Sequence, residues 1–213
     1  MFICLEGMHG VGKTTQCLLL KEKFEKKGGS TAIIVQPIDD YSKKIANEFA
    51  DNLEMKNNPT SILFVLLALY SKQSEKVYTA LKKEQIVIAD RWEETFYAYN
   101  NYFGPLSIKP KLFREMITDL AFGENEPDIT ILLDIPPEMA HKKYHDRGRE
   151  KLFHIKGSEE TNTLEGFKHI HEHYLKITKQ KENWFIVDGT KTIQQVHKSI
   201  LELINNNFVE PFS

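Results

Sequence analysis

The stretch EGMHGVGKTTQ, residues 6–16, decides the fold of this chain. It matches the spacing G-x-x-x-x-G-K-[ST], running from Gly7 to Lys13 and the threonine that follows. A loop with this spacing cradles the phosphates of a nucleotide. The apolar run FICLE at 2–6 has the length of a strand, and a helical pattern follows the loop. Because the motif sits between a strand and a helix, the sequence predicts a phosphate-binding P-loop.

Each part of the P-loop has an expected task. Its backbone N–H groups form a nest for anions at the positive end of the next helix. We expect Lys13 to reach the β- and γ-phosphates of ATP and the Thr14 hydroxyl to bind Mg²⁺. His9 raises a separate question, which is whether it helps to choose the acceptor of the phosphoryl group. The predicted nucleotide-binding residues are Gly7, His9, Gly10, Val11, Gly12, Lys13, Thr14 and Thr15.

Four more short apolar runs follow, at residues 31–36, 85–90, 128–134 and 184–188. Each is rich in Ile, Val or Phe, which is typical of strands buried on both faces. Helical patterns separate them, and this alternation predicts right-handed crossovers. We expect one α/β domain over 1–213 built around the P-loop, with a five-stranded parallel sheet flanked by helices on both faces. Ligands of such sheets bind beyond the carboxyl ends of the strands.

The helical patterns contain one unusual segment. The stretch SILFVLLALY at 61–70 is apolar on every side, so it must be buried in the core or against a partner. A homodimer is one explanation and a central core helix is the other. The last pattern begins with a capping box formed by Thr192 and Gln195. The predicted helices cover residues 14–28, 41–50, 60–83, 110–122, 136–145, 164–180 and 190–204.

The segment QIVIADRW supplies a second group of candidate site residues. Asp90 ends an apolar strand, which places its carboxylate beside the P-loop, where it can hold Mg²⁺ or its water shell. Arg91 adds a forked donor that suits phosphate oxygens. We therefore predict Thr14 and Asp90 as the metal-binding pair.

A basic run, HKKYHDRGREK at 141–151, supplies the third group. Its glycine and its position after a strand and a helix favour a mobile lid, at about 145–157, over a solvated helix face. Closing Arg147 and Arg149 over the transferring phosphoryl group would neutralise charge in the transition state and exclude water.

The bulk composition limits the class of protein. Of 213 residues, 41% are hydrophobic and 27% charged, which suits a globular protein with a sizeable core. A formal net charge of -2 argues against a dedicated nucleic-acid binder. The longest apolar run, at 62–70, is far shorter than the roughly 20 residues of a membrane span. Without secretory features, Cys4 and Cys17 are expected to be reduced, buried thiols, and the location cytoplasmic.

Taken together, the motifs resemble the thymidylate kinase family of P-loop nucleoside monophosphate kinases over nearly the whole chain. FICLEGMHGVGKTTQ resembles the family's first strand, P-loop and helix, and TALKKEQIVIADRW resembles its helix, strand and Asp-Arg-aromatic motif. Thr95, Ala98, Tyr99 and Asn100 follow at the spacing of the family's Ser-x-x-Ala-Tyr-Gln. PDITILLDIPPEMAHKKYHDRGR resembles the strand that leads into the lid, and FIVDGTKTIQQVHKSI the last strand and helix.

The resemblance implies transfer of a phosphoryl group from ATP, with Mg²⁺, to a (deoxy)nucleoside monophosphate, with dTMP to dTDP as the closest match. Phe64 would stack on the base, and Tyr99 would crowd the ribose 2′ position. Family members are usually homodimers packed through helices that include the 61–70 region. The implied catalytic residues are Lys13, Arg91, Arg147 and Arg149. The implied acceptor-binding residues are His9, Gln36, Phe64, Lys72, Arg91, Thr95 and Tyr99.

The departures from the family pattern lie mainly on the acceptor side. His9 replaces the usual Asp or Glu of the P-loop, and Gln36 replaces a Glu after the second strand. Family members carry an arginine on the helix after the base-stacking aromatic residue, whereas residues 1–90 contain none. Lys72 is a candidate substitute as a point charge. After the lid glycine, Lys-Leu-Phe-His at 151–154 replaces the usual acidic-arginine-apolar-acidic string.

Two other functions stay open at this point. A nucleoside kinase of the deoxynucleoside and viral thymidine kinase group is one, since some viral members carry Pro-His-Gly in the P-loop. Phosphorylating a 5′-hydroxyl requires a general base, which Gln36 cannot be, so Asp39 or Asp40 would have to serve. A monophosphate acceptor is already ionised and needs positioning more than a base. The other is an inactive nucleotide-binding regulatory protein, which fits the altered lid string but not the intact P-loop and arginines.

Two histidines on the predicted helix at 164–180 are candidates for a metal site. His169 and His173 lie one helical turn apart, a spacing that can bind a divalent metal. No third ligand is evident in the sequence. We therefore predict a solvated helix face there.

Overall fold

The structure is a computed structural model that describes residues 1–26, 32–36, 41, 44–45, 48, 58–103, 106–107, 109–146 and 162–208. Its centre is a five-stranded sheet in the order β2-β3-β1-β4-β5, in which every paired strand is parallel. All five strands begin and end within two residues of the predicted runs. The strands are β1 (Phe2–Glu6), β2 (Ala32–Val35), β3 (Ile86–Asp90), β4 (Ile129–Asp134) and β5 (Trp184–Asp188).

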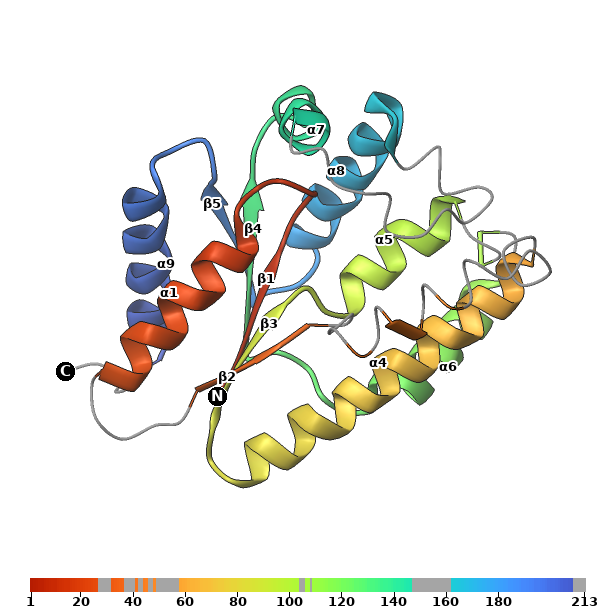
Figure 1. Ribbon diagram of the computed structural model, residues 1–213, viewed down its shortest axis with the longest axis horizontal. Helices are drawn as coiled ribbons and strands as arrows, with labels where there is room; N and C mark the ends of the chain where they lie inside the picture. The colour runs from red at the N-terminus through yellow and green to blue at the C-terminus, as the bar shows by residue number, and fades with distance from the viewer. Residues whose placement is uncertain are drawn as a thin grey trace.

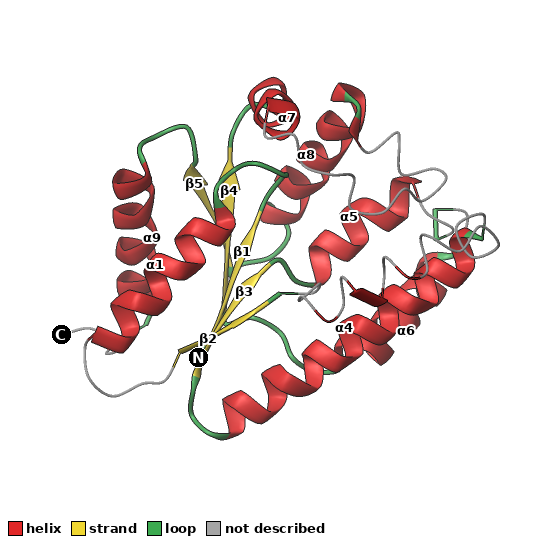
Figure 2. Cartoon of the chain, viewed as in Figure 1, coloured by secondary structure: helices red, strands yellow, loops and turns green. Residues whose placement is uncertain are grey.

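Helices cover both faces of the sheet, as predicted. Figure 1 shows α1 and α9 on one face and α4, α5, α6 and α8 on the other, with α7 beyond the end of β4. Figure 2 shows the same arrangement with the strands seen nearly edge-on between the two helical layers. The α/β class with a parallel sheet is therefore confirmed. The helices are α1 (Lys13–Lys26), α4 (Pro59–Lys82), α5 (Glu93–Phe103), α6 (Lys111–Phe122), α7 (Pro137–Asp146), α8 (Leu164–Thr178) and α9 (Ile193–Asn207).

The three central strands form the middle of the core. Every residue of β1 and β3 is buried, and so are the first five residues of β4. This burial on both faces is why their sequences read as continuous apolar runs rather than as an alternation of apolar and polar residues. Because the strands are parallel, their carboxyl ends meet at one edge, and the P-loop, Gln36, Asp90 and Asp134 all lie there.

Helix α4 departs from the expectation that 61–70 is buried all round. Leu63 and Tyr70 are buried against the sheet side, but the Phe64 side chain is 60% exposed and Ala68 is exposed as well. One side of this apolar segment therefore faces outward in the single chain. The core-helix explanation accounts for only part of the segment.

The predictions for the capping box and for the two cysteines are confirmed. Thr192 N–H donates to Gln195 Oε1 over 3.1 Å, and Gln195 N–H donates to Thr192 Oγ1 over 3.3 Å, which completes the predicted capping box. Cys4 and Cys17 are free and buried. Among the described residues, no helix has the length and apolar character to cross a membrane.

The structure contains one helix that the sequence did not predict, and two predicted segments fall largely outside the described residues. Helix α5 was not predicted; its segment EETFYAYNNYF is dominated by aromatic and asparagine residues, which are weak helix formers. The helix predicted at 41–50 falls mostly outside the described residues, and so does nearly all of the lid predicted at 145–157.

Candidate active site

The P-loop between β1 and α1 has the backbone geometry that its glycines allow. Gly7 and Gly12 have φ angles of 136° and 102°, a region that residues with a side chain rarely adopt. A Cβ atom on Gly7 would lie 2.7 Å from the carbonyl oxygen of Leu133 in β4. The loop therefore passes too close to the neighbouring strand for any other residue at position 7.

Lys13, the first residue of α1, folds back over this loop. Its ammonium group donates to the carbonyl oxygens of Gly7, at 3.0 Å, and Met8, at 2.7 Å, and the residue is only 6% exposed. Burial, together with the Arg91 charge, lowers the pKa of Lys13 to about 7, although Asp90 and Glu6 oppose the shift. With this pKa, part of the Lys13 side chain is neutral near pH 7 in the free protein. Phosphate oxygens would stabilise its protonated form, so Lys13 is suited to bind an anion.

Thr14 and Asp90, the predicted metal-binding pair, lie together. The Thr14 hydroxyl donates to Asp90 Oδ2 over 2.5 Å, and the Gln36 side-chain amide donates to the same oxygen over 3.2 Å. A hydroxyl and a carboxylate are the hard oxygen ligands that Mg²⁺ prefers, and it commonly takes one or two protein ligands beside substrate phosphates. The residues present at the base of the P-loop therefore fit this ion.

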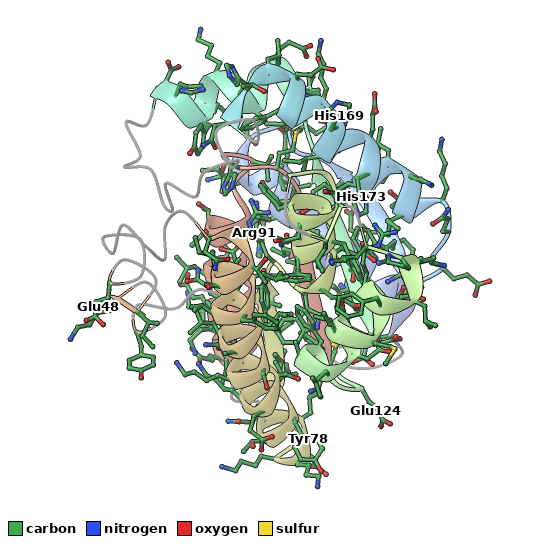
Figure 3. All side chains as sticks on the ribbon, turned by 90° about the vertical axis from the view of Figure 1, so that its right-hand side faces the viewer. Glu48, Tyr78, Arg91, Glu124, His169 and His173 are labelled. Carbon is green, nitrogen blue, oxygen red and sulfur yellow. The ribbon has the colours of Figure 1, made fainter. Side chains whose placement is uncertain are left out.

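Arg91 connects three more predicted residues. Its φ angle is 80°, a strained value for a residue with a side chain. One terminal nitrogen, Nη1, donates to Thr95 Oγ1 over 3.0 Å, and the other, Nη2, lies 3.3 Å from His9 Nδ1. The guanidinium carbon also lies 5.6 Å from the centre of the Tyr99 ring. Arg91 is partly buried, and Figure 3 labels it near the middle of the view.

His9 is packed among aromatic rings. Its ring centre lies 5.5 Å from that of Tyr99 in α5 and 5.4 Å from that of Tyr144 in α7. A guanidinium group can only donate hydrogen bonds, so His9 Nδ1 must accept from Arg91 and the ring proton is assigned to Nε2. The structure therefore places His9 in the same cluster as two residues predicted to contact the acceptor.

The remaining predicted residues lie apart from this cluster or outside the description. Phe64 is on α4 with an exposed side chain, and the Lys72 ammonium lies 4.5 Å from the centre of the Tyr41 ring. Gly10, Val11 and Thr15 complete the P-loop and the first turn of α1. Arg147 and Arg149 lie outside the described residues.

The pair His169 and His173 on α8, both labelled in Figure 3, interacts with carboxylates instead of sharing a ligand. His169 Nε2 lies 3.5 Å from Glu165 Oε1, and His173 Nε2 lies 3.2 Å from Glu94 Oε2. In the part of the chain that the structure describes, no group of three or more metal-binding side chains exists. The predicted solvated helix face fits His169, whose side chain is 42% exposed, but it is wrong for His173, whose side chain is 13% exposed and packs against the buried Glu94.

Sequence reasoning missed two buried residues beside Arg91. Glu6, at the end of β1, is fully buried, and its carboxylate accepts hydrogen bonds from Thr95 and from Tyr174 of α8. A carboxylate at the end of an otherwise apolar strand was a visible signal for Glu6. Tyr174 offered no comparable signal, because its role depends on a contact with a residue 168 positions away.

Comparison with known proteins agrees with this geometry. The family model for thymidylate kinase matches residues 5–200 of the chain. The thymidylate kinase of Fervidobacterium nodosum is 31% identical over 209 residues, which cover 96% of this chain and 98% of that protein. The thymidylate kinase of Bacillus pumilus is 30% identical over 213 residues, which cover 97% of this chain and 95% of that protein. The predicted resemblance is confirmed: the chain belongs to the thymidylate kinase family.

Proposed function

We propose that this chain transfers the γ-phosphoryl group of ATP to dTMP, giving ADP and dTDP. The observation that carries the proposal is the meeting of Lys13, the Thr14–Asp90 pair and Arg91 at the carboxyl edge of the sheet. Membership of the thymidylate kinase family and relatives that bear this name over nearly their full length support dTMP as the acceptor.

The donor side would work through the P-loop. Lys13 would exchange the carbonyl oxygens of Gly7 and Met8 for the β- and γ-phosphate oxygens of ATP. Thr14 and Asp90 would hold Mg²⁺, which neutralises charge on the phosphates and orients them. To accept the ion, the Thr14 hydroxyl would give up its hydrogen bond to Asp90.

The acceptor side would work by positioning. The phosphate of dTMP is ionised at neutral pH, so no general base is needed to make it a nucleophile. Arg91 would hold that phosphate in line with the γ-phosphoryl group, with His9 and Tyr99 bordering the sugar. We also propose Gln36, Thr95, Phe64 and Lys72 as acceptor-side residues, as the family resemblance implies.

The nucleoside kinase alternative is not favoured. It needs a general base near the 5′-hydroxyl, at the position of Gln36. The Gln36 amide donates a hydrogen bond to Asp90, so this residue acts as a donor at the carboxyl edge. Asp39 and Asp40 lie outside the described residues.

We further propose that residues 1–213 form a single domain and that the protein is cytoplasmic. A lid at about 145–157 would bring Arg147 and Arg149 to the phosphoryl group.

We also propose a homodimer that packs through α4 and α6. Large apolar side chains lie exposed on these two adjacent helices: Phe64 at 60%, Leu112 at 69%, Met116 at 61% and Leu120 at 85%. The three exposed residues of α6 recur every four positions, which places them on one face of that helix, and an exposed apolar face marks an association surface. Light scattering of wild-type protein and Leu120→Glu tests it: a dimer that becomes monomeric supports the proposal, and a monomeric wild type contradicts it.

An acceptor panel tests the proposed activity. ADP release would be followed with ATP, Mg²⁺ and, in turn, dTMP, other nucleoside monophosphates, thymidine and other nucleosides. We expect the highest kcat/KM with dTMP and negligible turnover with thymidine. Turnover of thymidine without turnover of any monophosphate would contradict the proposal, and nucleotide binding without ADP release would favour the regulatory alternative.

A further inference from the structure

Two hydrogen bonds to residues of β1 fix the backbone around Arg91. Its own N–H donates to the Leu5 carbonyl oxygen over 3.0 Å, and the next N–H, that of Trp92, donates to Glu6 Oε1 over 2.8 Å. Arg91 has a φ angle of 80° between these two bonds. A strained backbone persists only where its surroundings hold it, and here the Glu6 carboxylate is one of the groups that do so.

The same carboxylate controls the side chain of Arg91 through Thr95. The Thr95 hydroxyl donates to Glu6 Oε2 over 2.6 Å, which leaves its oxygen free to accept from Arg91 Nη1 at 3.0 Å. The direction of the Thr95 hydroxyl proton therefore decides whether Arg91 finds an acceptor there. A hydroxyl that turned toward another partner would face the guanidinium group with a donor and repel it.

Tyr174 of α8 completes this buried cluster. Its hydroxyl donates to Glu6 Oε2 over 3.0 Å and lies 2.9 Å from Thr95 Oγ1. Glu6 thus accepts from two backbone N–H groups and two hydroxyls, and the Cys4 thiol lies 4.0 Å from its Oε1. Neither Glu6 nor Tyr174 has exposed surface, so these hydrogen bonds are made inside the protein.

We propose that Glu6 and Tyr174 are positioning residues that, through the Thr95 hydroxyl, hold the Arg91 guanidinium group in its working orientation. Neither touches substrate. The role of the oriented Arg91 in phosphoryl transfer rests on the proposed function, whereas the orientation itself can be measured without any substrate. Through Tyr174, the helix α8 contributes to the geometry of a residue in the active site.

The first test measures the orientation directly. The chain contains four arginines, so ¹⁵N spectra of arginine side chains in ¹⁵N-arginine-labelled protein are simple enough to assign Arg91 by its Arg91→Lys variant. In Tyr174→Phe, which removes only the hydroxyl, we expect faster rotation of the Arg91 guanidinium group. Thr178→Val is the matched control, because it removes a hydroxyl on the same helix whose bond goes to the Tyr174 carbonyl. Unchanged Arg91 signals in Tyr174→Phe would overturn the proposal.

The second test asks whether the orientation matters for transfer. We expect Tyr174→Phe and Thr95→Val each to lower kcat with dTMP about tenfold, the size of effect that misplacing a positioning group produces. The KM for ATP should stay within about twofold, and Thr95→Ser, which keeps the hydroxyl, should recover most of the loss of Thr95→Val. A loss of kcat that is matched by a lower melting temperature and is not recovered in Thr95→Ser would reflect loss of folding and would contradict the positioning role.

A double-mutant cycle separates positioning from independent effects. If Tyr174 acts through Arg91, then Tyr174→Phe should change the rate little in the Arg91→Lys background. Losses that multiply in the double variant would contradict the proposal. If wild-type protein fails to phosphorylate dTMP but uses another acceptor, the proposed function fails, and the cycle is run with that acceptor. The side-chain spectra decide the positioning claim in either case.

Discussion

The proposed donor half and the proposed acceptor half of the candidate active site are built differently. The donor half consists of one short segment and one strand end: the P-loop glycines, Lys13 on the loop carbonyl groups, and Asp90 beside Thr14. The acceptor half is assembled from side chains on separate elements, with Arg91 between His9 and Thr95. The donor half departs little from the family pattern, whereas the acceptor half carries His9 in place of an acid. We therefore expect substitutions in the donor half to remove transfer to every acceptor, and those in the acceptor half to change how one acceptor is used.

The largest effect is expected for Lys13→Ala. It should lower kcat by roughly 10²–10³, because the ammonium group stabilises charge that develops on the phosphates during transfer. Far-UV circular dichroism should be unchanged. Lys21→Ala on the same helix is the control, since Lys21 pairs with Glu25 at the surface. Wild-type turnover in Lys13→Ala would refute the assignment of the P-loop.

Asp90→Asn is expected to have the next largest effect. Replacing a carboxylate ligand by an amide should lower kcat about 100-fold at low Mg²⁺, and raising the Mg²⁺ concentration should recover part of the loss. The matched control is Asp188→Asn at the end of β5, where the aspartate is exposed and bonds to Thr190. An unchanged Mg²⁺ dependence in Asp90→Asn would remove Asp90 from the metal site.

His9→Asp tests the acceptor half with a smaller change. An aspartate would restore the charge usual in the family and form an ion pair with Arg91 in place of the present contact with the ring nitrogen. We expect the KM for dTMP to change about three- to tenfold, with the KM for ATP unchanged. If both KM and kcat with dTMP are indifferent, His9 has no part in choosing the acceptor.

The buried lysine gives the smallest but most specific effect, a dependence on pH. The pKa of Lys13 is lowered to about 7, so at pH 8 much of the free protein carries a neutral amine. Binding of ATP with Mg²⁺ should then draw in up to about one proton at pH 8 and very little at pH 6. Calorimetric titrations in buffers of different ionisation enthalpy measure this uptake. Equal proton uptake at the two pH values would contradict the account of Lys13.

The same lowered pKa has a consequence for stability. Between pH 7 and the ordinary lysine range near 10.4, the unfolded chain binds more protons at Lys13 than the folded chain does. The contribution of this group to the free energy of unfolding therefore rises with pH across that window. Lys13→Met removes the contribution, so its melting temperature should show a weaker rise over the same range. An identical pH dependence in the two proteins would contradict this expectation.

The contrast between the two halves also explains what the sequence could predict. Lys13 and the carbonyl groups it contacts lie within seven residues, and strand ends follow from short apolar runs, so the donor half could be placed from local patterns. The Thr192 capping box was predictable for the same reason. The contact of Arg91 with His9 spans 82 positions, and that of Tyr174 with Glu6 spans 168. Such contacts depend on how the helices pack in three dimensions, so the spacing of apolar residues along the sequence cannot predict them.

Helix α5 shows the same limit on a smaller scale. Its aromatic residues favour other structures, yet Phe96 and Ala98 are buried against the rest of the fold, so packing outweighs the local preference. The helix carries Thr95 and Tyr99. The family resemblance therefore identified these acceptor-side residues, but the sequence could not predict how they lie relative to Arg91 and His9. The positive φ of Arg91, directly before this helix, was equally invisible in the sequence.

The most direct test of the central claim is the identity of the product. We would follow ATP, Mg²⁺, dTMP and wild-type protein by ³¹P NMR and compare the amounts of new diphosphate and of ADP. The account predicts dTDP and ADP in equal amounts, with no release of inorganic phosphate and no reaction of thymidine under the same conditions. Formation of dTMP from thymidine in place of dTDP from dTMP, or release of phosphate without dTDP, would contradict it.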